Sequence, residues 1–172
     1  TNVSNKHNIE VANTYRSMGL TFHELNKSDK AIDMLKQAIS VFQKIDGNTN
    51  SIASSLRSLA RVYGDIEVYE SAKEALLESL DISIRAGDKK SEAMCYHELG
   101  FLEWKFGNHG KVEQYYSQSL EINRKGGFLL GEADVLRDMA RNTRLENPEK
   151  SEQLLASCNK IRSQIGLESL ES

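Results

Sequence analysis

Apolar residues recur along this chain at steps of three and four, the spacing that puts side chains on one face of an α-helix. The alternation of apolar and polar residues that is typical of strands is absent. Pro148 is the only proline among the 172 residues, so few positions forbid a helix. The pattern therefore predicts an all-α protein, and it is clear in the apolar positions Ala31, Leu35, Ala38, Ile39, Phe42 and Ile45.

Short polar or glycine-containing stretches break this pattern at intervals and predict eight helices arranged as antiparallel pairs. The boundaries carry an error of about two to four residues. The first helices of the pairs are expected near residues 8–25, 50–65, 90–106 and 131–145. The second helices are expected near residues 29–45, 69–86, 110–125 and 149–164.

The pairs repeat with a period of about 40 residues, a spacing typical of solenoids. Small residues mark the repeat on the first helices, spaced by 41, 40 and 40 residues, at Gly19, Ala60, Gly100 and Ala140. Small residues also recur on the second helices, at Ala38, Ser79, Ser119 and Cys158. Two helices approach closely only where small side chains face the partner, so these positions are expected at the contact within each pair.

A single pair cannot bury its apolar face alone, so the pairs are expected to stack on one another. The sequence therefore predicts one domain over residues 1–172, with repeats at about 8–47, 49–88, 89–127 and 130–165. The chain begins without a methionine and ends in the polar stretch GLESLES, from which we expect a fragment of a longer protein.

Each repeat also carries a motif, seen first in Tyr15, Met18, Gly19, Phe22, Ala31 and Leu35. With these residues the sequence resembles the tetratricopeptide repeat family, and its period resembles the longer subgroup of about 40 residues. The resemblance implies a right-handed superhelical solenoid of four helix pairs, whose first helices line a concave surface. Glu103 and Thr143 depart from the pattern, because an aromatic residue is expected at both positions.

Composition and charge narrow the function classes. The net charge is −3, which gives no reason to expect nucleic acid or an anionic membrane as a partner. No apolar run approaches the length of a membrane span. Two cysteines, Cys95 and Cys158, make neither a disulfide framework nor a zinc pair, which favours a reducing, cytoplasmic setting.

The stretch SEAMCYHELGF, residues 91–101, holds the most chemically suggestive residues. Cys95 and His97 stand two residues apart on a predicted helix, so they point in different directions and do not form a nucleophile–base pair. His97-Glu98 begins like a metalloprotease motif, but Phe101 stands where that motif needs a second histidine. We therefore expect no catalytic residue, no metal site and no cofactor, and the chain is predicted not to be an enzyme.

One flank of each predicted first helix, beside the core stripe, is rich in arginine. Arginine side chains suit carboxylates and phosphates, and two aromatic residues add an apolar anchor. This flank predicts a groove for an acidic or phosphorylated peptide. We call it the basic face, and its residues are Arg16, His23, Arg57, Arg61, His97, Phe101, Trp104, Arg137, Arg141 and Arg144.

The alternative interpretation is a solvated surface of weak ion pairs, since acids stand at helical neighbour spacing from several of these arginines. The pairs would be Asp134 with Arg137, Asp138 with Arg141, and Arg61 with Asp65. Arg16 and Arg57 have no acid at that spacing, so this interpretation does not account for them.

Three functions follow from this pattern. The first is a scaffold or signalling module that binds a peptide or partner protein. The second is a sensory or regulatory segment of a larger signalling protein, acting on domains of its own chain. The third is an enzyme, although no residue pattern in the sequence supports that function. The ends of a repeat stack also lack neighbours, so end-to-end self-association is expected through exposed Ile161, Ile165 and Leu167.

Overall fold

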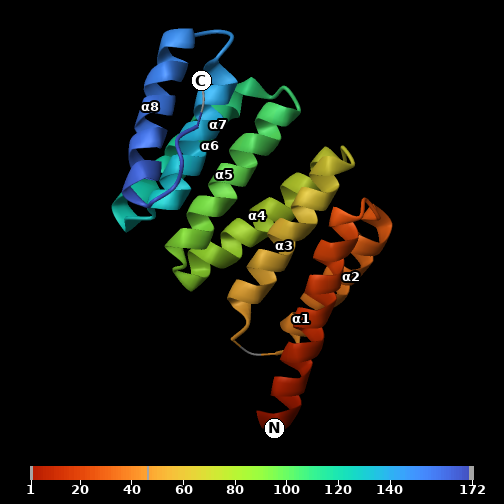
Figure 1. Cartoon of the computed structure of the whole chain (residues 1–172). Coiled ribbons are helices and arrows are strands. Elements are labelled where there is room, and N and C mark those ends of the chain that lie inside the picture. Colours follow the sequence, from red (N-terminus) through yellow and green to blue (C-terminus); the bar gives the residue numbers. More distant parts are fainter. Residues whose placement is uncertain (1, 46, 171–172) are drawn as a thin grey trace. The chain divides into compact units, whose positions relative to one another are not determined.

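The structure is a computed structural model that describes residues 2–45 and 47–170. Across these ranges the chain forms eight helices and no strand (Figure 1). The prediction of an all-α fold is therefore confirmed. The helices are α1 (Asn2–Glu24), α2 (Ser28–Gln43), α3 (Thr49–Asp65), α4 (Tyr69–Ala86), α5 (Lys89–Lys105), α6 (His109–Gly126), α7 (Leu129–Thr143) and α8 (Pro148–Gln164).

Every helix boundary except one lies within two residues of its predicted position. The exception is the start of α1, which begins at Asn2 instead of near residue 8. The prediction took the first apolar residues of the pattern as the start of the helix. No glycine or proline precedes them, so nothing in the sequence stops the helix from extending through polar residues toward the N-terminus.

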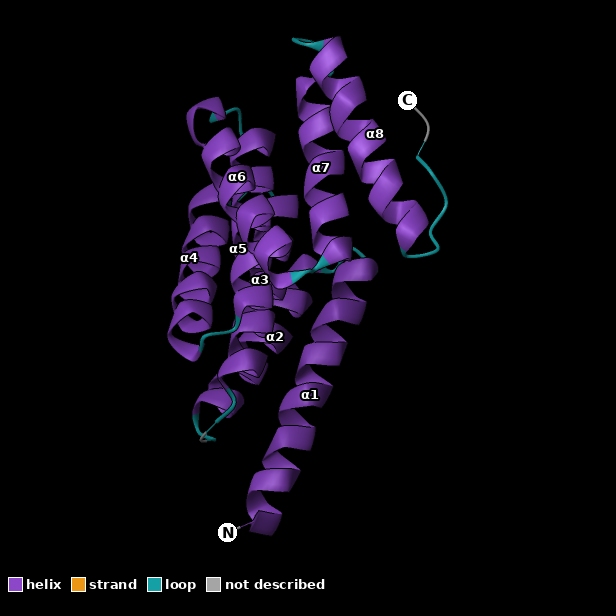
Figure 2. Cartoon of the chain, turned by 90° about the vertical axis from the view of Figure 1, so that its left-hand side faces the viewer, coloured by secondary structure: helices purple, strands orange, loops and turns teal. Residues whose placement is uncertain are grey.

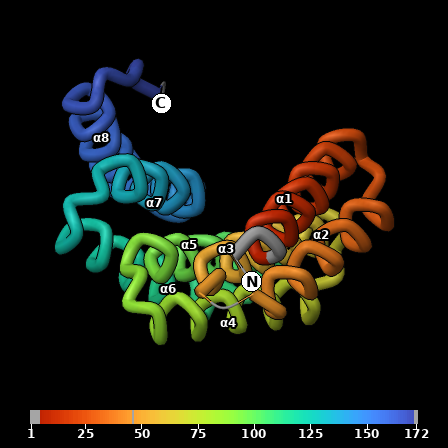
Figure 3. Tube along the Cα trace, turned by 90° about the horizontal axis from the view of Figure 1, so that it is seen from below, coloured from red at the N-terminus to blue at the C-terminus, as the bar shows by residue number. Residues whose placement is uncertain are grey.

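Contacts between Cα atoms group the chain into two compact units, with the boundary between Ser91 and Glu92. Unit 1 contains α1 to α4, and unit 2 contains α6 to α8 and nearly all of α5. In unit 1, α1 packs on α2, α2 on α3, and α3 on α4; in unit 2, α6 packs on α7 and α7 on α8 (Figures 2 and 3). Each unit thus holds two of the predicted repeats, and the single domain remains a prediction.

The predicted close contacts within the helix pairs are present in both units. A Cβ atom added to Gly19 would lie 2.7 Å from Cγ of Leu35, and one added to Gly100 would lie 2.7 Å from Cδ1 of Tyr116. Such distances are too short for carbon atoms, so only glycine allows these helices to approach so closely.

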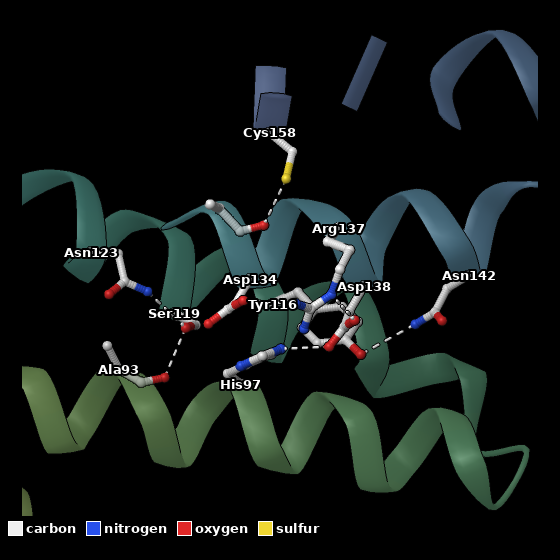
Figure 4. Close-up of polar contacts among 11 residues, drawn as sticks. Ala93, His97, Tyr116, Ser119, Asn123, Asp134, Arg137, Asp138, Asn142 and Cys158 are labelled. Carbon is white, nitrogen blue, oxygen red and sulfur yellow. Dashed lines mark hydrogen bonds and ion pairs between the residues drawn. The ribbon is translucent and has the colours of Figure 1, made fainter. Parts of the chain in front are cut away.

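The small residues of the second helices do more than leave room for packing. The Ser79 hydroxyl donates a hydrogen bond of 2.8 Å to the carbonyl of Ala53, and Ser119 donates one of 2.7 Å to Ala93. The thiol of Cys158 makes the corresponding contact with the carbonyl of Ala133 at 3.2 Å (Figure 4). All three side chains are buried, and each donates a hydrogen bond to a main-chain carbonyl, so none of these three buried donors is left unsatisfied.

A glycine follows the C-terminal end of each second helix. These glycines have positive φ angles between 66° and 80°, a backbone region that favours glycine, and they are Gly47, Gly87, Gly127 and Gly166. The turns inside the pairs use the same region at Asn26 (φ 55°), Glu67 (φ 62°) and Gly107 (φ 75°). The glycine series keeps the 40-residue period, although the sequence analysis identified the period from other residues.

After α8 the chain turns back along the same helix (Figure 2). Leu170 packs against the buried cluster of Ala133, Leu136 and Cys158, and Ile161 packs there too. Leu167 is exposed, as predicted, whereas Ile161 and Ile165 are half-buried. The returning segment therefore covers part of the surface that the sequence analysis expected to be open.

Candidate functional site

The first residue of the basic face in unit 1 is Arg16 of α1, whose side chain contacts α3. Its guanidinium donates to Ser54 Oγ at 2.9 Å and to Asn13 Oδ1 at 3.1 Å. It also lies 5.9 Å from the centre of the Phe42 ring. These partners are all uncharged, so within the described chain no carboxylate neutralises this half-buried cation.

The other unit 1 residues differ in their surroundings. His23 Nε2 lies 2.9 Å from Asp65 Oδ2, which links the C-terminal ends of α1 and α3. Arg57 is half-buried, whereas Arg61 is exposed on α3. Burial alone would raise the pKa of Asp88, but hydrogen bonds from Ser91 and the charge of Arg57 lower it below its ordinary value.

In unit 2 the buried carboxylate of Asp138 organises the basic face (Figure 4). His97 Nε2 lies 2.8 Å from one of its oxygens, and Arg137 Nε donates to the other at 3.1 Å. Arg137 Nη1 also donates to Asp134 at 2.8 Å. Burial would raise the pKa of Asp138, but the hydrogen bonds and charges of His97 and Arg137 together lower it.

The contacts in unit 2 decide two of the three predicted ion pairs. Arg137 pairs with Asp134 as expected. The expected pair of Asp138 with Arg141 does not form among the described residues, because His97 and Arg137 occupy both oxygens of Asp138. His97 and Arg137 therefore belong to a polar network between α5 and α7, not to an open cationic surface.

The two predicted aromatic anchors lie together but are not equally accessible. The rings of Phe101 and Trp104 have their centres 5.8 Å apart. Trp104 packs against the buried cluster of Val112, Tyr116 and Val135. The Phe101 side chain is 38% exposed, so it is the more available of the two to a ligand.

The C-terminal half of α7 lines a pocket of about 390 Å³, which we call the arginine pocket. Arg137, Arg141 and Arg144 stand on its α7 side. The side chains of Arg141 and Arg144 are exposed and form no hydrogen bond or ion pair with any residue that the structure describes. The opposite wall consists of residues of α8 and the returning segment, namely Pro148, Ser151, Glu152, Leu155 and Leu170.

The sequence pattern predicted the arginines of this pocket but not its α8 wall. The signal was the small residue Ala140, which the repeat places at the contact between the two helices of its pair. In the structure the Ser151 hydroxyl donates to the carbonyl of Ala140 at 2.8 Å, which fixes α8 beside the arginines. Leu170 could not be found in this way, because it follows the last helix and belongs to no repeat.

The residues that suggested catalysis are placed unfavourably for it. Cys95 is fully buried, so its thiol is closed to a substrate, and His97 is bound to Asp138. Burial raises the pKa of the Cys158 thiol, which favours the unreactive form. A search of residues 2–45 and 47–170 for clustered histidine, cysteine and acidic side chains finds no group that could hold a metal ion.

None of the described helices is both long enough and apolar enough to cross a membrane.

Comparison with known proteins identifies the repeat. A family model described as a tetratricopeptide repeat matches residues 51–125, and a second model with the same description matches residues 12–44. The chain belongs to the tetratricopeptide repeat family. The two matches together cover more than half of the chain and include the small residues that mark the first three repeats.

The tetratricopeptide repeats of this chain are similar to those of bacterial regulators. The regulatory protein RapK of Bacillus subtilis (strain 168) is 27% identical over 94 residues, which make up 55% of this chain and 25% of RapK. Two solved structures share the fold. Aspartyl phosphate phosphatase F from Bacillus subtilis superimposes with a TM-score of 0.84 at 11% identity, over 92% of this chain and 42% of that chain.

The second structure is the Rap conjugation gene regulator of the plasmid pLS20, solved in complex with the Phr* peptide. Its TM-score is 0.76 at 14% identity, and the match covers 91% of this chain and 43% of that chain. The present chain thus spans about a quarter of the length of RapK and less than half of either solved chain.

Proposed function

We propose that this tetratricopeptide repeat chain is a binding module for a peptide or partner protein that carries acidic or phosphorylated residues. The observation that carries the proposal is the arginine pocket, where Arg141 and Arg144 stand exposed beside Arg137 without a carboxylate partner in the described chain. Among the described residues that line it, Glu152 is the only acidic one. The pocket therefore presents an excess of positive charge in a protein whose net charge is −3.

The chemistry of the pocket suits an anionic group. A guanidinium donates two parallel hydrogen bonds to a carboxylate or a phosphate, and such charge-assisted bonds are stronger than neutral ones. Ala140, Leu155 and Leu170 provide apolar wall beside the guanidiniums. This wall excludes part of the water that would otherwise screen the charge, so a bound anion interacts more strongly there than on an open surface.

The remaining residues of the basic face differ in how much of their side chain a ligand could contact. Arg61 and Phe101 are exposed and offer direct contacts to a ligand. Three residues connect the two first helices of their own unit and so fix the positions of those helices. They are Arg16, His23 and His97. Arg57 and Trp104 are half-buried and present only part of their surface.

Two features of the relatives bear on the function, and each supports a different candidate. The plasmid pLS20 regulator was solved with a bound peptide, on a fold that this chain shares. RapK is named a regulatory protein, and this chain corresponds to a quarter of its length. The second feature favours the alternative function, a regulatory segment that acts on other domains of a larger signalling protein.

The test compares two charge reversals of the same residue type. A fluorescently labelled peptide rich in Asp and Glu, its phosphoserine analogue and its neutral Asn/Gln analogue are titrated into each purified chain. We expect the double variant Arg141→Glu/Arg144→Glu to bind the charged peptides about tenfold more weakly than the parent or worse, since hydrogen bonds to charged groups contribute about 1.5–3 kcal/mol each.

The control is Arg85→Glu, which reverses an exposed arginine of α4 that pairs with Asp81. It should leave affinity within about twofold, and binding to the parent should weaken as salt shortens the Debye length below about 8 Å. Equal affinities for the double variant and the control would refute the arginine pocket as the ligand site. Release of phosphate from the phosphoserine peptide by the parent would refute a purely binding function.

A further inference from the structure

The segment after α8 is held against that helix by contacts that recognise its main chain. At Gly166 the backbone has a φ of 75°, and the Leu167 amide donates to the Arg162 carbonyl at 2.8 Å, which closes the helix and reverses the chain. From there the segment runs back beside α8 without forming a helix (Figures 2 and 3).

Asn159 on α8 makes both main-chain hydrogen bonds of one residue of this segment. Its Nδ2 donates to the Leu170 carbonyl at 3.0 Å, and its Oδ1 accepts from the Leu170 amide at 2.7 Å. Arg162, one helical turn later, donates from Nε to the Glu168 carbonyl at 2.7 Å. A side-chain amide bound in this way makes the two hydrogen bonds that a neighbouring β-strand would make, because it offers one donor and one acceptor to the same residue.

The side chain of Leu170 fills an apolar site on α7 and α8. It packs against the buried residues Ala133, Leu136 and Cys158. This surface therefore combines two recognition elements, the Asn159 side chain that binds a peptide main chain and an apolar site that accommodates a leucine-like side chain. This combination is how peptide-binding grooves reconcile affinity with specificity.

We propose that the surface of α7 and α8 that holds residues 166–170 is a second peptide-binding site, which adjoins the arginine pocket because Leu170 also lines that pocket. Its ligand is a non-helical peptide with a leucine, bound through Asn159 at that leucine and through Arg162 at the carbonyl two residues before it. Residues 166–170 occupy the site in cis. The inference does not rest on the proposed function, because none of the hydrogen bonds that hold the segment involves Arg141 or Arg144.

Because residues 166–170 already occupy the site, they determine how tightly an external peptide can bind there. A short flexible tether supplies an effective concentration in the millimolar range, so the chain's own segment competes strongly with any free peptide. A peptide of the same pattern should bind only when it displaces residues 166–170, or when that segment has been weakened.

The experiment weakens the segment in the full chain and supplies the same residues in trans. Leu170→Asp places a charge in the apolar site and should release the segment. The probe is an acetylated peptide of sequence GLESLES, identical to residues 166–172, and binding is followed by chemical-shift changes of the chain's amides. We expect the Leu170→Asp chain to bind this peptide about tenfold more tightly than the parent or better.

Two matched changes establish that the recognition is as described. Adding Asn159→Ala to the Leu170→Asp chain should weaken peptide binding about tenfold, because both main-chain hydrogen bonds are lost. The peptide GLESDES should not bind. If Leu170→Asp impairs folding, Leu170→Ala replaces it, since that variant removes the apolar contact without introducing a charge.

The parent chain offers an independent measurement. Asn159→Ala should raise the hydrogen-exchange rate of the Leu170 amide at least about tenfold while amides inside α7 keep their protection. Equal affinity of the peptide for the parent and for Leu170→Asp would overturn the proposal. So would an unchanged Leu170 exchange rate in Asn159→Ala, and in either case residues 166–170 are only a fixed covering of α8.

Discussion

Units 1 and 2 pack their helices in the same way but hold their arginines differently. In both units a glycine on a first helix meets a large side chain of the second helix, Leu35 in unit 1 and Tyr116 in unit 2. Arg16 of unit 1 is bound by neutral groups, whereas Arg137, at the corresponding repeat position, is bound by Asp134 and Asp138. The repeat conserves small and apolar positions, and the polar residues between first helices vary freely around them.

A further difference concerns the ends of the first helices. The His23 side chain at the end of α1 is bound by Asp65 of α3. The side chain of Arg144, which occupies the corresponding position after α7, has no partner in the part of the chain that the structure describes. The same repeat position thus serves as a helix–helix contact in one unit and as pocket lining in the other. Repeat position alone does not assign a residue to a binding surface.

The largest expected effect tests the packing that the two units share. Gly19→Leu and Gly100→Leu should each destabilise the chain by about 3 kcal/mol, because even a Cβ atom there would lie 2.7 Å from the facing side chain. The matched control is Gly110→Leu, because a Cβ at Gly110 would meet no atom within 4 Å. Chemical denaturation measures all three variants. A Gly100→Leu chain as stable as Gly110→Leu would contradict the proposed register of the pairs.

The second prediction tests the difference between the polar contacts. Asp138→Ala should cost about 2 kcal/mol, because it leaves His97 and Arg137 without their buried charged acceptor. Ser54→Ala removes the corresponding acceptor of Arg16 but should cost about 0.5 kcal/mol or less, since the bond is between partly exposed groups. Similar losses from the two substitutions, measured by urea denaturation, would remove the distinction drawn here between the units.

The stabilisation that Asp138 provides is expected to depend on pH. The pKa of Asp138 is lower in the folded chain than its ordinary value near 3.8, so the folded state favours the ionised form. The stabilisation is therefore complete above about pH 5 and is lost as the pH falls through the folded pKa. Between pH 7 and pH 3 the parent should lose more thermal stability than Asp138→Asn, which has no group to titrate at this position.

The sequence predicted the helices and their packing well because both leave periodic signals. The small residues that repeat at Gly19 and Gly100 located the close contacts, and the structure shows why nothing larger fits there. The polar contacts were less predictable. Local spacing found the pair of Arg137 with Asp134, three residues apart, but not the pair of His97 with Asp138, 41 residues apart.

Two further features left no periodic signal. Asn159 is one of many polar residues of α8, and nothing in the sequence connects it with Leu170, 11 residues later. The arginine pocket was only half predicted, because the arginines follow helical spacing on α7 while the opposing wall depends on how α8 returns beside them. Contacts that depend on tertiary placement need the structure, even where each helix is evident from the sequence.

The smallest expected effect tests the turns inside the helix pairs. Unit 1 uses Glu67 with a φ of 62° where unit 2 uses Gly107 with a φ of 75°. A residue with a Cβ atom in this left-handed region costs about 1 kcal/mol or more, and glycine avoids most of that cost. Glu67→Gly should therefore stabilise the chain by about 0.5–1 kcal/mol, and Gly107→Ala should destabilise it by a similar amount. Thermal denaturation of the two variants beside the parent checks both signs. If Glu67→Gly lowered the melting temperature, the side chain of Glu67 would contribute more to the turn than its backbone conformation costs.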